Sequence, residues 1–278
     1  MNYLKLELII SDNYQEFVIA ELMDFDFYGF EQNDDGLIAY VEKPRFNDSN
    51  REQIELMIST IPGAEVAGFS EVEEQNWNES WEASIQPQSI GSFFVRPTWS
   101  DEQPDEGQLL LEIDPKMSFG TGYHATTRLM LRRLSKLDCK GKRILDAGTG
   151  TGILAIAAVK LGADQAIAFD YDPLCEQNAT ENAIINNTGN IMDIRLGGIE
   201  TVENEEPFDL ILANINRNII LEFLGRLISL LKEGGTLCLS GLLQTDETTV
   251  KAALEPFNAG IVDKQTEGEW ILLEVVRR

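Results

Sequence analysis

The segment that most constrains the fold of this chain is a glycine-rich stretch at residues 148–152, Gly-Thr-Gly-Thr-Gly. It follows a short apolar run at residues 143–147 and leads directly into a second apolar run at residues 153–161. Glycines at such a junction permit a tight turn between strand and helix, and they let the backbone come close to a ligand. The pattern predicts an α/β sheet with a ligand crevice beside its first strand.

The spacing of these glycines separates the loop from the common nucleotide-binding motifs. Gly148, Gly150 and Gly152 follow G-x-G-x-G rather than the G-x-G-x-x-G that cradles a pyrophosphate, and no Gly-Lys-Ser/Thr follows them. A nicotinamide oxidoreductase and a P-loop enzyme are therefore disfavoured. With Asp146 in front of it, the loop suits a nucleoside that carries an amino-acid tail. The alternative is a turn with only a packing role.

Polar residues stand at the ends of two further apolar runs. Asp170 ends the run at residues 165–170, and Asn214 follows the run at residues 208–213. A carboxylate at this place can accept hydrogen bonds from both ribose hydroxyls, with a merely solvated aspartate as the alternative. An amide offers both a donor and an acceptor to a substrate amine. Since ligands of open α/β sheets bind at the carboxyl ends of the strands, we expect both side chains beside Gly148.

A polar segment at residues 114–127 lies just before the helix that precedes the glycine loop. It is too long and too polar for a simple turn, so we expect it to cover the cofactor. It contains the only histidine of the chain, His124. A catalytic base and a structural cap are both open for this residue, and we favour the cap.

From residue 109 onward the chain alternates apolar strands with helices, which indicates a mostly parallel sheet covered on both faces. The predicted strands span residues 143–147, 165–170, 192–196, 208–213, 236–240 and 271–276. The predicted helices span residues 124–137, 153–161 and 173–186, with further helical stretches between the later strands.

The first 73 residues predict a small separate domain. Strands at residues 4–10, 28–31, 37–41 and 65–72 and helices at residues 12–25 and 49–59 have the order β-α-β-β-α-β, which is that of a ferredoxin-like sandwich. A helix at residues 73–85 carries Trp77 and Trp81 on one face. We expect this pair to pack in a core; a substrate-facing or hinge role is the alternative.

These patterns divide the chain into three parts. We expect a small N-terminal domain at residues 1–73, a connecting helix and linker at 74–106, and the domain of the glycine loop at 107–278. At the junction of the last two parts, residues 97–107 are rich in Pro, Gly and acidic side chains and predict a surface loop.

The formal net charge of −25 is concentrated at the start of the chain, where residues 1–105 hold 22 acidic and five basic side chains. Such a surface repels a phosphate backbone, so direct binding of nucleic acid is disfavoured. It attracts a basic protein or a cationic small molecule. Solubility alone is the alternative explanation for the acidity.

Other function classes are disfavoured by what the sequence lacks. Cys139, Cys175 and Cys238 are isolated from one another, so we expect neither a metal site nor a disulfide. No apolar run approaches the roughly 20 residues that span a bilayer. The N-terminus lacks the features of a signal peptide. We therefore expect a soluble, cytoplasmic protein with no membrane contact.

Several segments together resemble one protein family. Residues 114–127 fit the pattern D-P-x-x-(A/S)-F-G-T-G-x-H-x-T-T, and residues 212–214 fit a strand end of the form V-A-N. Trp77 and Trp81 fit a W-x-x-x-W helix, and residues 268–270 fit the family's ending. The chain thus resembles the bacterial methyltransferases of ribosomal protein L-eleven, the PrmA family.

This resemblance implies a Rossmann-like class I methyltransferase domain with a mostly parallel seven-stranded sheet, beside a small N-terminal α+β domain of ferredoxin-like form. It implies S-adenosylmethionine as the cofactor and S-adenosylhomocysteine as the product. Carried over by position, the cofactor contacts come from Thr127, Gly148, Asp170 and Asn214. We add residues of the covering segment and of the glycine loop as further contacts: Phe119, Gly120, Thr121 and Gly150.

The resemblance also implies the acceptor. Family members methylate lysine side chains and the N-terminal amine of a basic ribosomal protein of the large subunit, which their N-terminal domain grips. Because the surface is acidic, we expect the free protein to be the acceptor, and we expect a monomeric enzyme. The polar Asn216 and Arg217 depart from the small residues that usually follow the family's V-A-N, which bears on the shape of the amine pocket.

In the expected reaction, Asn214 positions a neutral amine for in-line displacement of the sulfonium methyl. Phe119, Tyr123 and Trp270 are candidate aromatic partners of the methylated head group. Two other functions stay open, a methyltransferase acting on a small-molecule amine and a non-catalytic protein-binding module. Binding of S-adenosylmethionine separates the enzymes from the module.

Overall fold

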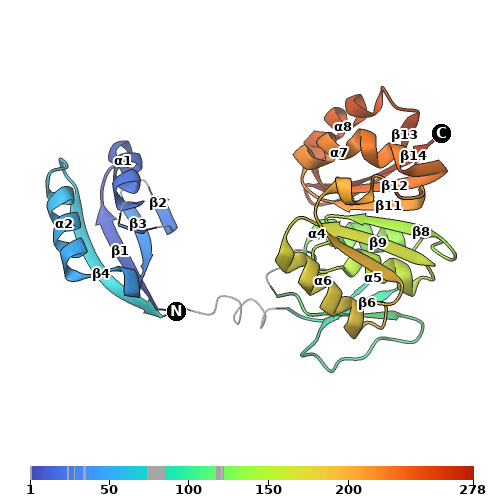
Figure 1. The fold of residues 1–278 in the computed structure, drawn as a ribbon, viewed down its shortest axis with the longest axis horizontal. Helices are drawn as coiled ribbons and strands as arrows, with labels where there is room; N and C mark the ends of the chain where they lie inside the picture. The colour runs from blue at the N-terminus through green and yellow to red at the C-terminus, as the bar shows by residue number, and fades with distance from the viewer. Residues whose placement is uncertain are drawn as a thin grey trace. The chain divides into compact units, whose positions relative to one another are not determined.

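The computed structural model describes residues 2–23, 25–27, 29–33, 36–73, 85–116, 120 and 122–278 (Figure 1). The expected helix with Trp77 and Trp81 lies outside these residues, as do Phe119 and Thr121. The chain divides into two compact units, Met1–Trp81 and Glu82–Arg278. None of the helices in the described ranges has the length and apolar character needed to cross a membrane.

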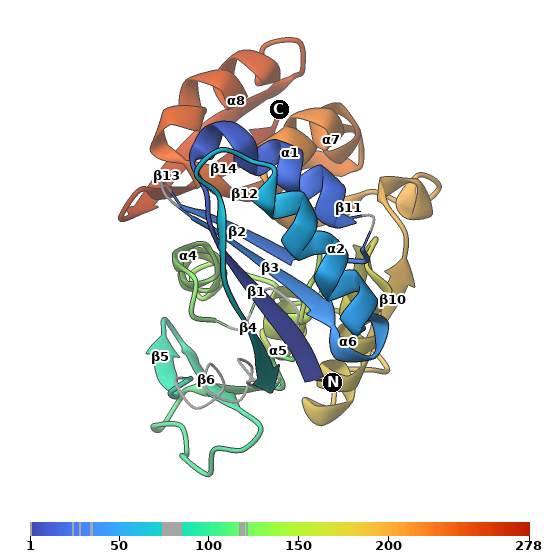
Figure 2. The same cartoon turned by 90° about the vertical axis from the view of Figure 1, so that its left-hand side faces the viewer.

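The first unit is a four-stranded antiparallel sheet with two helices on one face (Figure 2). Its strands lie in the order β2-β3-β1-β4. Leu6 and Leu8 are buried beneath the helices, whereas Ile9 is half exposed, as the alternation of a strand requires. The expected β-α-β-β-α-β order is confirmed. The elements are β1 (Asn2–Ile9), α1 (Asp12–Met23), β2 (Gly29–Asn33), β3 (Gly36–Glu42), η1 (Lys43–Arg45), α2 (Asp48–Ser59) and β4 (Glu65–Glu73).

The second unit is built on a seven-stranded sheet in the order β10-β9-β8-β11-β12-β14-β13. The five strands β8 to β12 pair in parallel, and β14 runs antiparallel between β12 and β13. The mostly parallel seven-stranded sheet is therefore confirmed, although β13 was not predicted. The strands are β8 (Arg143–Ala147), β9 (Gln165–Asp170), β10 (Met192–Leu196), β11 (Phe208–Asn214), β12 (Leu231–Leu243), β13 (Ala259–Glu267) and β14 (Trp270–Arg277).

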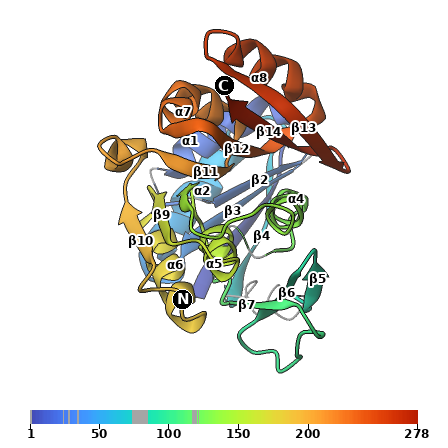
Figure 3. The same ribbon diagram turned by 90° about the vertical axis from the view of Figure 1, so that its right-hand side faces the viewer.

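Helices cover both faces of this sheet (Figure 3). Ile144 packs in the core shared with α4 and α5, whereas its neighbour Leu145 packs in the core shared with α7 and α8. Strands buried on both faces explain the apolar runs in the sequence. The helices are α4 (Ala125–Leu134), α5 (Ile153–Lys160), α6 (Pro173–Ile185), η2 (Ile199–Val202), α7 (Arg217–Ser229), η3 (Gln244–Asp246) and α8 (Glu247–Leu254).

A small three-stranded sheet, β5 (Gln88–Ile90), β6 (Phe93–Pro97) and β7 (Leu109–Ile113), belongs to the second unit. This part of the structure differs from the expected linker at residues 74–106, because β5 and β6 contribute to the core of the second unit through buried side chains such as Phe93. The loop between β6 and β7 agrees with the expected surface loop. β5 has only three residues, which is too short for the alternation of a strand to show in the sequence.

Candidate active site

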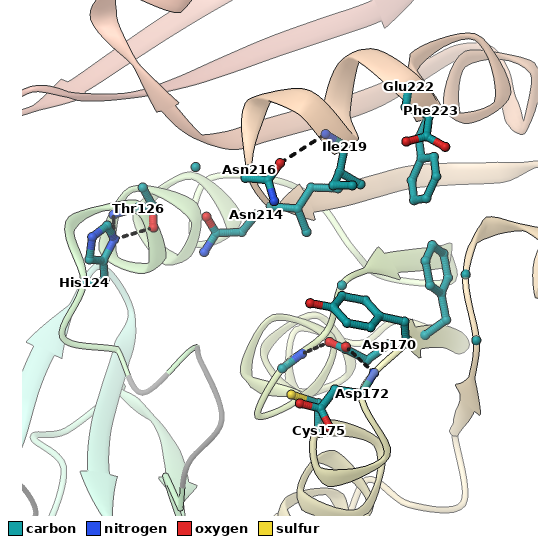
Figure 4. A pocket seen from close by; sticks show the side chains of 18 of the residues that line it. His124, Thr126, Asp170, Asp172, Cys175, Asn214, Asn216, Ile219, Glu222 and Phe223 are labelled. Carbon is teal, nitrogen blue, oxygen red and sulfur yellow. Dashed lines mark hydrogen bonds between the residues drawn. The ribbon is translucent and has the colours of Figure 1, made fainter. Parts of the chain in front are cut away.

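A cavity of about 720 Å³ lies in the second unit, where the strands β8, β9 and β11 end (Figure 4). Its volume is within the range of about 300–1,000 Å³ that is typical of small-molecule sites. The edge where these strands end is the place at which open α/β sheets bind ligands. The lining residues are His124, Thr126, Gly148, Gly150, Phe169, Asp170, Tyr171, Asp172, Cys175, Gly197, Gly198, Asn214, Ile215, Asn216, Ile219, Glu222, Phe223, Gly241 and Trp270.

The glycine loop connects β8 to α5 and forms one wall of this cavity. Gly148 has a φ of 70°, and a Cβ atom there would lie 2.3 Å from Cγ2 of Ile215. The backbone nitrogens of Gly148 and Thr149 both donate to the carbonyl oxygen of Phe169, at 2.9 and 3.0 Å. Only glycine fits position 148, as we expected for the tight turn between strand and helix.

Asp146 holds the loop from the side away from the cavity. Its Oδ2 atom accepts hydrogen bonds from Thr149 Oγ1 at 2.7 Å and from the Ala155 nitrogen at 3.2 Å. Its Oδ1 atom is buried and has no partner among the described residues. Burial raises the pKa of this carboxyl to about 7, against the lowering effect of the two hydrogen bonds. Asp146 does not line the cavity, so its contact with the loop is structural.

Asp170 ends β9 and lines the cavity. Its Oδ2 atom accepts a hydrogen bond from the Gly150 nitrogen at 3.0 Å, and its Oδ1 atom accepts one from the Asp172 nitrogen at 3.1 Å. A carboxylate has about four acceptor positions, so acceptor capacity remains for a ligand. Asp172 in turn caps α6 by accepting from the Leu174 nitrogen. The strand end, the glycine loop and the helix start are thus joined through one carboxylate.

Asn214 ends β11 on the other side of the cavity (Figure 4). Its Nδ2 atom donates to Thr127 Oγ1 at 3.4 Å. Its Oδ1 atom is buried and has no partner among the described residues. A buried acceptor without a partner is rare in a folded protein, so this atom lacks a donor that the described residues do not supply. Thr127 itself does not line the cavity and lies behind Asn214.

His124 caps the N-terminus of α4, as expected: its Nδ1 atom accepts from the Thr126 nitrogen and lies 2.7 Å from Thr126 Oγ1. Its ring meets the indole of Trp270 edge to face, with 4.7 Å between the ring centroids. Burial and the nearby Arg128 lower the pKa of His124, while Glu267 acts in the opposite direction. The imidazole is therefore neutral at neutral pH.

The structure brings together most of the described residues that the sequence analysis singled out. Gly148, Gly150, Asp170 and Asn214 line one cavity. Gly120 does not line it, but its carbonyl oxygen accepts from Thr151 Oγ1 at 2.7 Å, beside the glycine loop. Among the described candidate aromatics, Trp270 lines the cavity, whereas Tyr123 does not.

Sequence reasoning missed much of the apolar wall. Tyr171 lines the cavity, and its side chain is 84% exposed. Its place directly after Asp170 in the sequence could have indicated this role. Ile219 and Phe223 come from α7, where the sequence gives no sign of which helix face reaches the site. In the ranges that the structure describes, no cluster of three or more His, Cys, Asp or Glu residues could hold a metal ion.

Comparison with known proteins agrees with this geometry. A sequence profile described as ribosomal protein L11 methyltransferase (PrmA) matches residues 5–278. A protein named ribosomal protein L11 methyltransferase from Chlorobaculum tepidum is 37% identical over 282 residues, which cover 97% of this chain and 95% of that protein. The relative of the same name from Porphyromonas gingivalis is 38% identical over 271 residues, with coverage of 96% and 92%.

A solved structure also supports membership of this family. The crystal structure titled ribosomal protein L11 methylase from Lactobacillus delbrueckii subsp. bulgaricus superimposes with a TM-score of 0.64 and 32% sequence identity. The match covers 69% of this chain and 98% of that chain. The family profile, the relatives and the fold all agree with the resemblance drawn from residues 114–127. The chain therefore belongs to the ribosomal protein L11 methyltransferase family, PrmA.

Proposed function

We propose that this protein transfers methyl groups from S-adenosylmethionine to lysine side-chain and N-terminal amines of ribosomal protein L11. The observation that carries the proposal is the meeting of Gly148, Gly150, Asp170 and Asn214 on a single cavity. Relatives that share more than a third of its residues over nearly the whole chain carry the name of this activity.

The residues of the cavity fit this cofactor. Asp170 keeps acceptor capacity for the two ribose hydroxyls after its bonds to the Gly150 and Asp172 nitrogens. The glycine loop leaves room for the amino-acid tail, because no Cβ atom projects from Gly148 or Gly150. Ile219 and other apolar residues of the cavity, among them Phe169, Tyr171 and Phe223, offer surface to the adenine base. We also propose that Thr127 contributes to the cofactor site through Asn214, which it holds in place, and that Phe119, Gly120 and Thr121 contribute further contacts.

When bound, the cofactor supplies an electrophilic methyl group on a cationic sulfonium. The acceptor amine must be neutral to attack it, and for a lysine of pKa near 10.4 deprotonation at pH 7 costs about 4.6 kcal/mol. Burial of the amine beside a positive charge lowers its pKa, so the amine gives its proton to solvent as it enters the cavity. The buried Oδ1 atom of Asn214 accepts a hydrogen bond from the amine and aligns its lone pair.

The acceptor side of the proposal rests on charge. Residues 1–105 carry 22 acidic and five basic side chains, which favours a basic protein and opposes contact with RNA. We propose that the first unit recognises L11, that L11 is modified before it joins the ribosome, and that the enzyme acts in the cytoplasm as a monomer. An assembled subunit would present its RNA to this acidic surface.

The test is methyl transfer from isotopically labelled S-adenosylmethionine to purified L11, followed by mass spectrometry of the modified amines. Free L11 and intact large subunits are compared, and an unrelated basic protein serves as the control. We expect label on L11 alone, and faster labelling of the free protein. A chain that binds no S-adenosylmethionine at millimolar concentration would be a non-catalytic module, and the proposal would fail.

A further inference from the structure

Three asparagines on one face of α6 bind the free edge of β7 and Asp114, the residue that follows this strand. They are Asn178, Asn182 and the helix-capping Asn186, spaced four residues apart, and all three are buried. β6 occupies one edge of β7, and on the other edge these side chains take the place of a strand. We refer to them as the asparagine ladder.

Asn182 binds both polar groups of one backbone unit. Its Oδ1 atom accepts from the Asp114 nitrogen at 2.8 Å, and its Nδ2 atom donates to the Asp114 carbonyl oxygen at 3.1 Å. Asn186 does the same two residues earlier on the strand, where it binds the nitrogen and carbonyl oxygen of Glu112 at 3.1 and 2.6 Å. The two side chains thus bind the backbone in the same way, Asn186 within β7 and Asn182 directly after it.

The two asparagines differ in their third hydrogen bond. Asn186 donates its second Nδ2 proton to the carbonyl oxygen of Asn182, one turn earlier in the chain. Asn182 donates its second Nδ2 proton to the carbonyl oxygen of Thr151, at 3.0 Å, and Thr151 belongs to the glycine loop. The Oγ1 atom of Thr151 then donates to the carbonyl oxygen of Gly120 at 2.7 Å.

These bonds make a continuous link between the glycine loop and the segment at residues 114–127, the two segments that the proposed function assigns to the cofactor. Asn182 joins the start of residues 114–127 to the glycine loop, and Thr151 joins the loop to Gly120 farther along the same segment. Asn182 and Thr151 are both fully buried, so the loss of one of these bonds leaves a buried polar group without that partner. Neither residue lines the cavity.

We propose that Asn182 is a positioning residue for the cofactor, which acts by fixing the glycine loop against the segment that begins at Asp114. Without Asn182, the Thr151 carbonyl oxygen loses this buried donor and the loop loses one of the contacts that hold it. The Asp114 carbonyl oxygen keeps a second donor in Asn178, at 3.0 Å. Removal of the Asn182 side chain therefore takes a hydrogen bond mainly from the Asp114 nitrogen and from the Thr151 carbonyl oxygen of the loop.

The inference rests on the proposed cofactor, S-adenosylmethionine. A substitution of Asn186 supplies the matched control. Asn182→Ala and Asn186→Ala each remove three side-chain hydrogen bonds, one of them buried and two partly buried, so both are expected to lower the Tm by several degrees. Only Asn182→Ala is expected to weaken binding of S-adenosylhomocysteine, by about tenfold, the effect of one buried hydrogen bond. The KM for S-adenosylmethionine should rise in parallel while kcat at saturation changes little.

Thr151→Val is a milder test of the same link, because it keeps the volume and the backbone while removing the donor to Gly120. It is expected to weaken binding several-fold, and it replaces Asn182→Ala if that variant does not fold. Wild-type affinity in a folded Asn182→Ala or Thr151→Val variant would overturn the positioning role. Failure of the wild-type protein itself to bind S-adenosylhomocysteine would instead overturn the proposed function, and the positioning role with it.

Discussion

Asn214 at the end of β11 donates a hydrogen bond to Thr127 in the first turn of α4, with 3.4 Å between Nδ2 and Oγ1. This contact spans 87 residues of sequence and ties the sheet to the segment at residues 114–127. With Nδ2 directed to Thr127, the Oδ1 atom stays buried without a partner among the described residues. Because Asn214 lines the cavity, we assign this acceptor to an incoming N–H group.

Replacement of this acceptor should affect turnover more than cofactor binding. For Asn214→Ala we expect kcat to fall about 100-fold, since the loss of a positioned transition-state contact costs about 2.7 kcal/mol. The dissociation constant of S-adenosylmethionine should change only a few-fold. Steady-state kinetics with L11 and calorimetry separate the two effects. Thr127→Val, which removes only the anchor, should reduce kcat less, and equal losses in kcat and affinity would contradict the positioning role.

Asp170 should affect cofactor affinity instead. In Asp170→Asn one oxygen becomes an NH₂ group that faces a backbone donor, the nitrogen of either Gly150 or Asp172. Hydrogen bonds to a charged group contribute about 1.5–3 kcal/mol, so we expect affinity to fall roughly 10- to 100-fold. Asp172→Asn is the control, because asparagine caps a helix as well as aspartate does. Calorimetric titration that finds wild-type affinity in Asp170→Asn would rule out the ribose contact.

The glycine loop can be probed with two alanine substitutions that share backbone strain but differ in space. Gly148 and Gly107 have φ angles of 70° and 87°, so alanine is strained at both positions. A Cβ atom at 148 would also meet Cγ2 of Ile215 at 2.3 Å, whereas at 107 no atom lies within 4 Å. We expect Gly148→Ala to lower the free energy of unfolding by about 1–3 kcal/mol more than Gly107→Ala. Urea denaturation measures this difference, and equal losses would mean that Ile215 moves aside freely.

Much of this site could be predicted because parallel strands bring their carboxyl ends to one edge. Gly148, Asp170 and Asn214 stand at or just after the ends of three apolar runs, and topology alone then places them together. The bounds of β8 and β9 also agree with the predicted residues, since strands buried on both faces give unbroken apolar runs. The cap at His124 followed from its place before a helical pattern.

Other parts depend on contacts that local sequence does not encode. Ile219 and Phe223 reach the cavity because of how α7 packs on the sheet, and the helix periodicity is the same for any docking angle. Asn182 binds Asp114 across 68 residues of sequence through a side chain and a backbone group. Asparagine is common at turns and caps, so its position in a helix gave no indication of this contact.

Asp146 makes the stability of the second unit depend on pH in a direction that is unusual for an aspartate. Burial raises the pKa of its carboxyl to about 7 in the folded protein, whereas an unfolded chain has a pKa near 3.9. Between about pH 4 and pH 7 the folded state therefore keeps a proton that the unfolded state has lost. Since stability falls with pH wherever the folded state binds more protons, this carboxyl destabilises the fold progressively across that window, and its effect is constant above it.

Asp146→Asn removes this titration while it keeps an oxygen that can accept from Thr149 and from the Ala155 nitrogen. We expect the urea denaturation midpoint of the variant to be equal to or slightly below that of the wild type at pH 4.5. At pH 8 we expect it to be higher than that of the wild type. Other groups with shifted pKa values, such as His124, are present in both proteins and cancel in the difference. A difference between variant and wild type that stays the same from pH 4.5 to pH 8 would show that Asp146 is ionised throughout, and that the cofactor loop rests on a buried carboxylate rather than a buried acid.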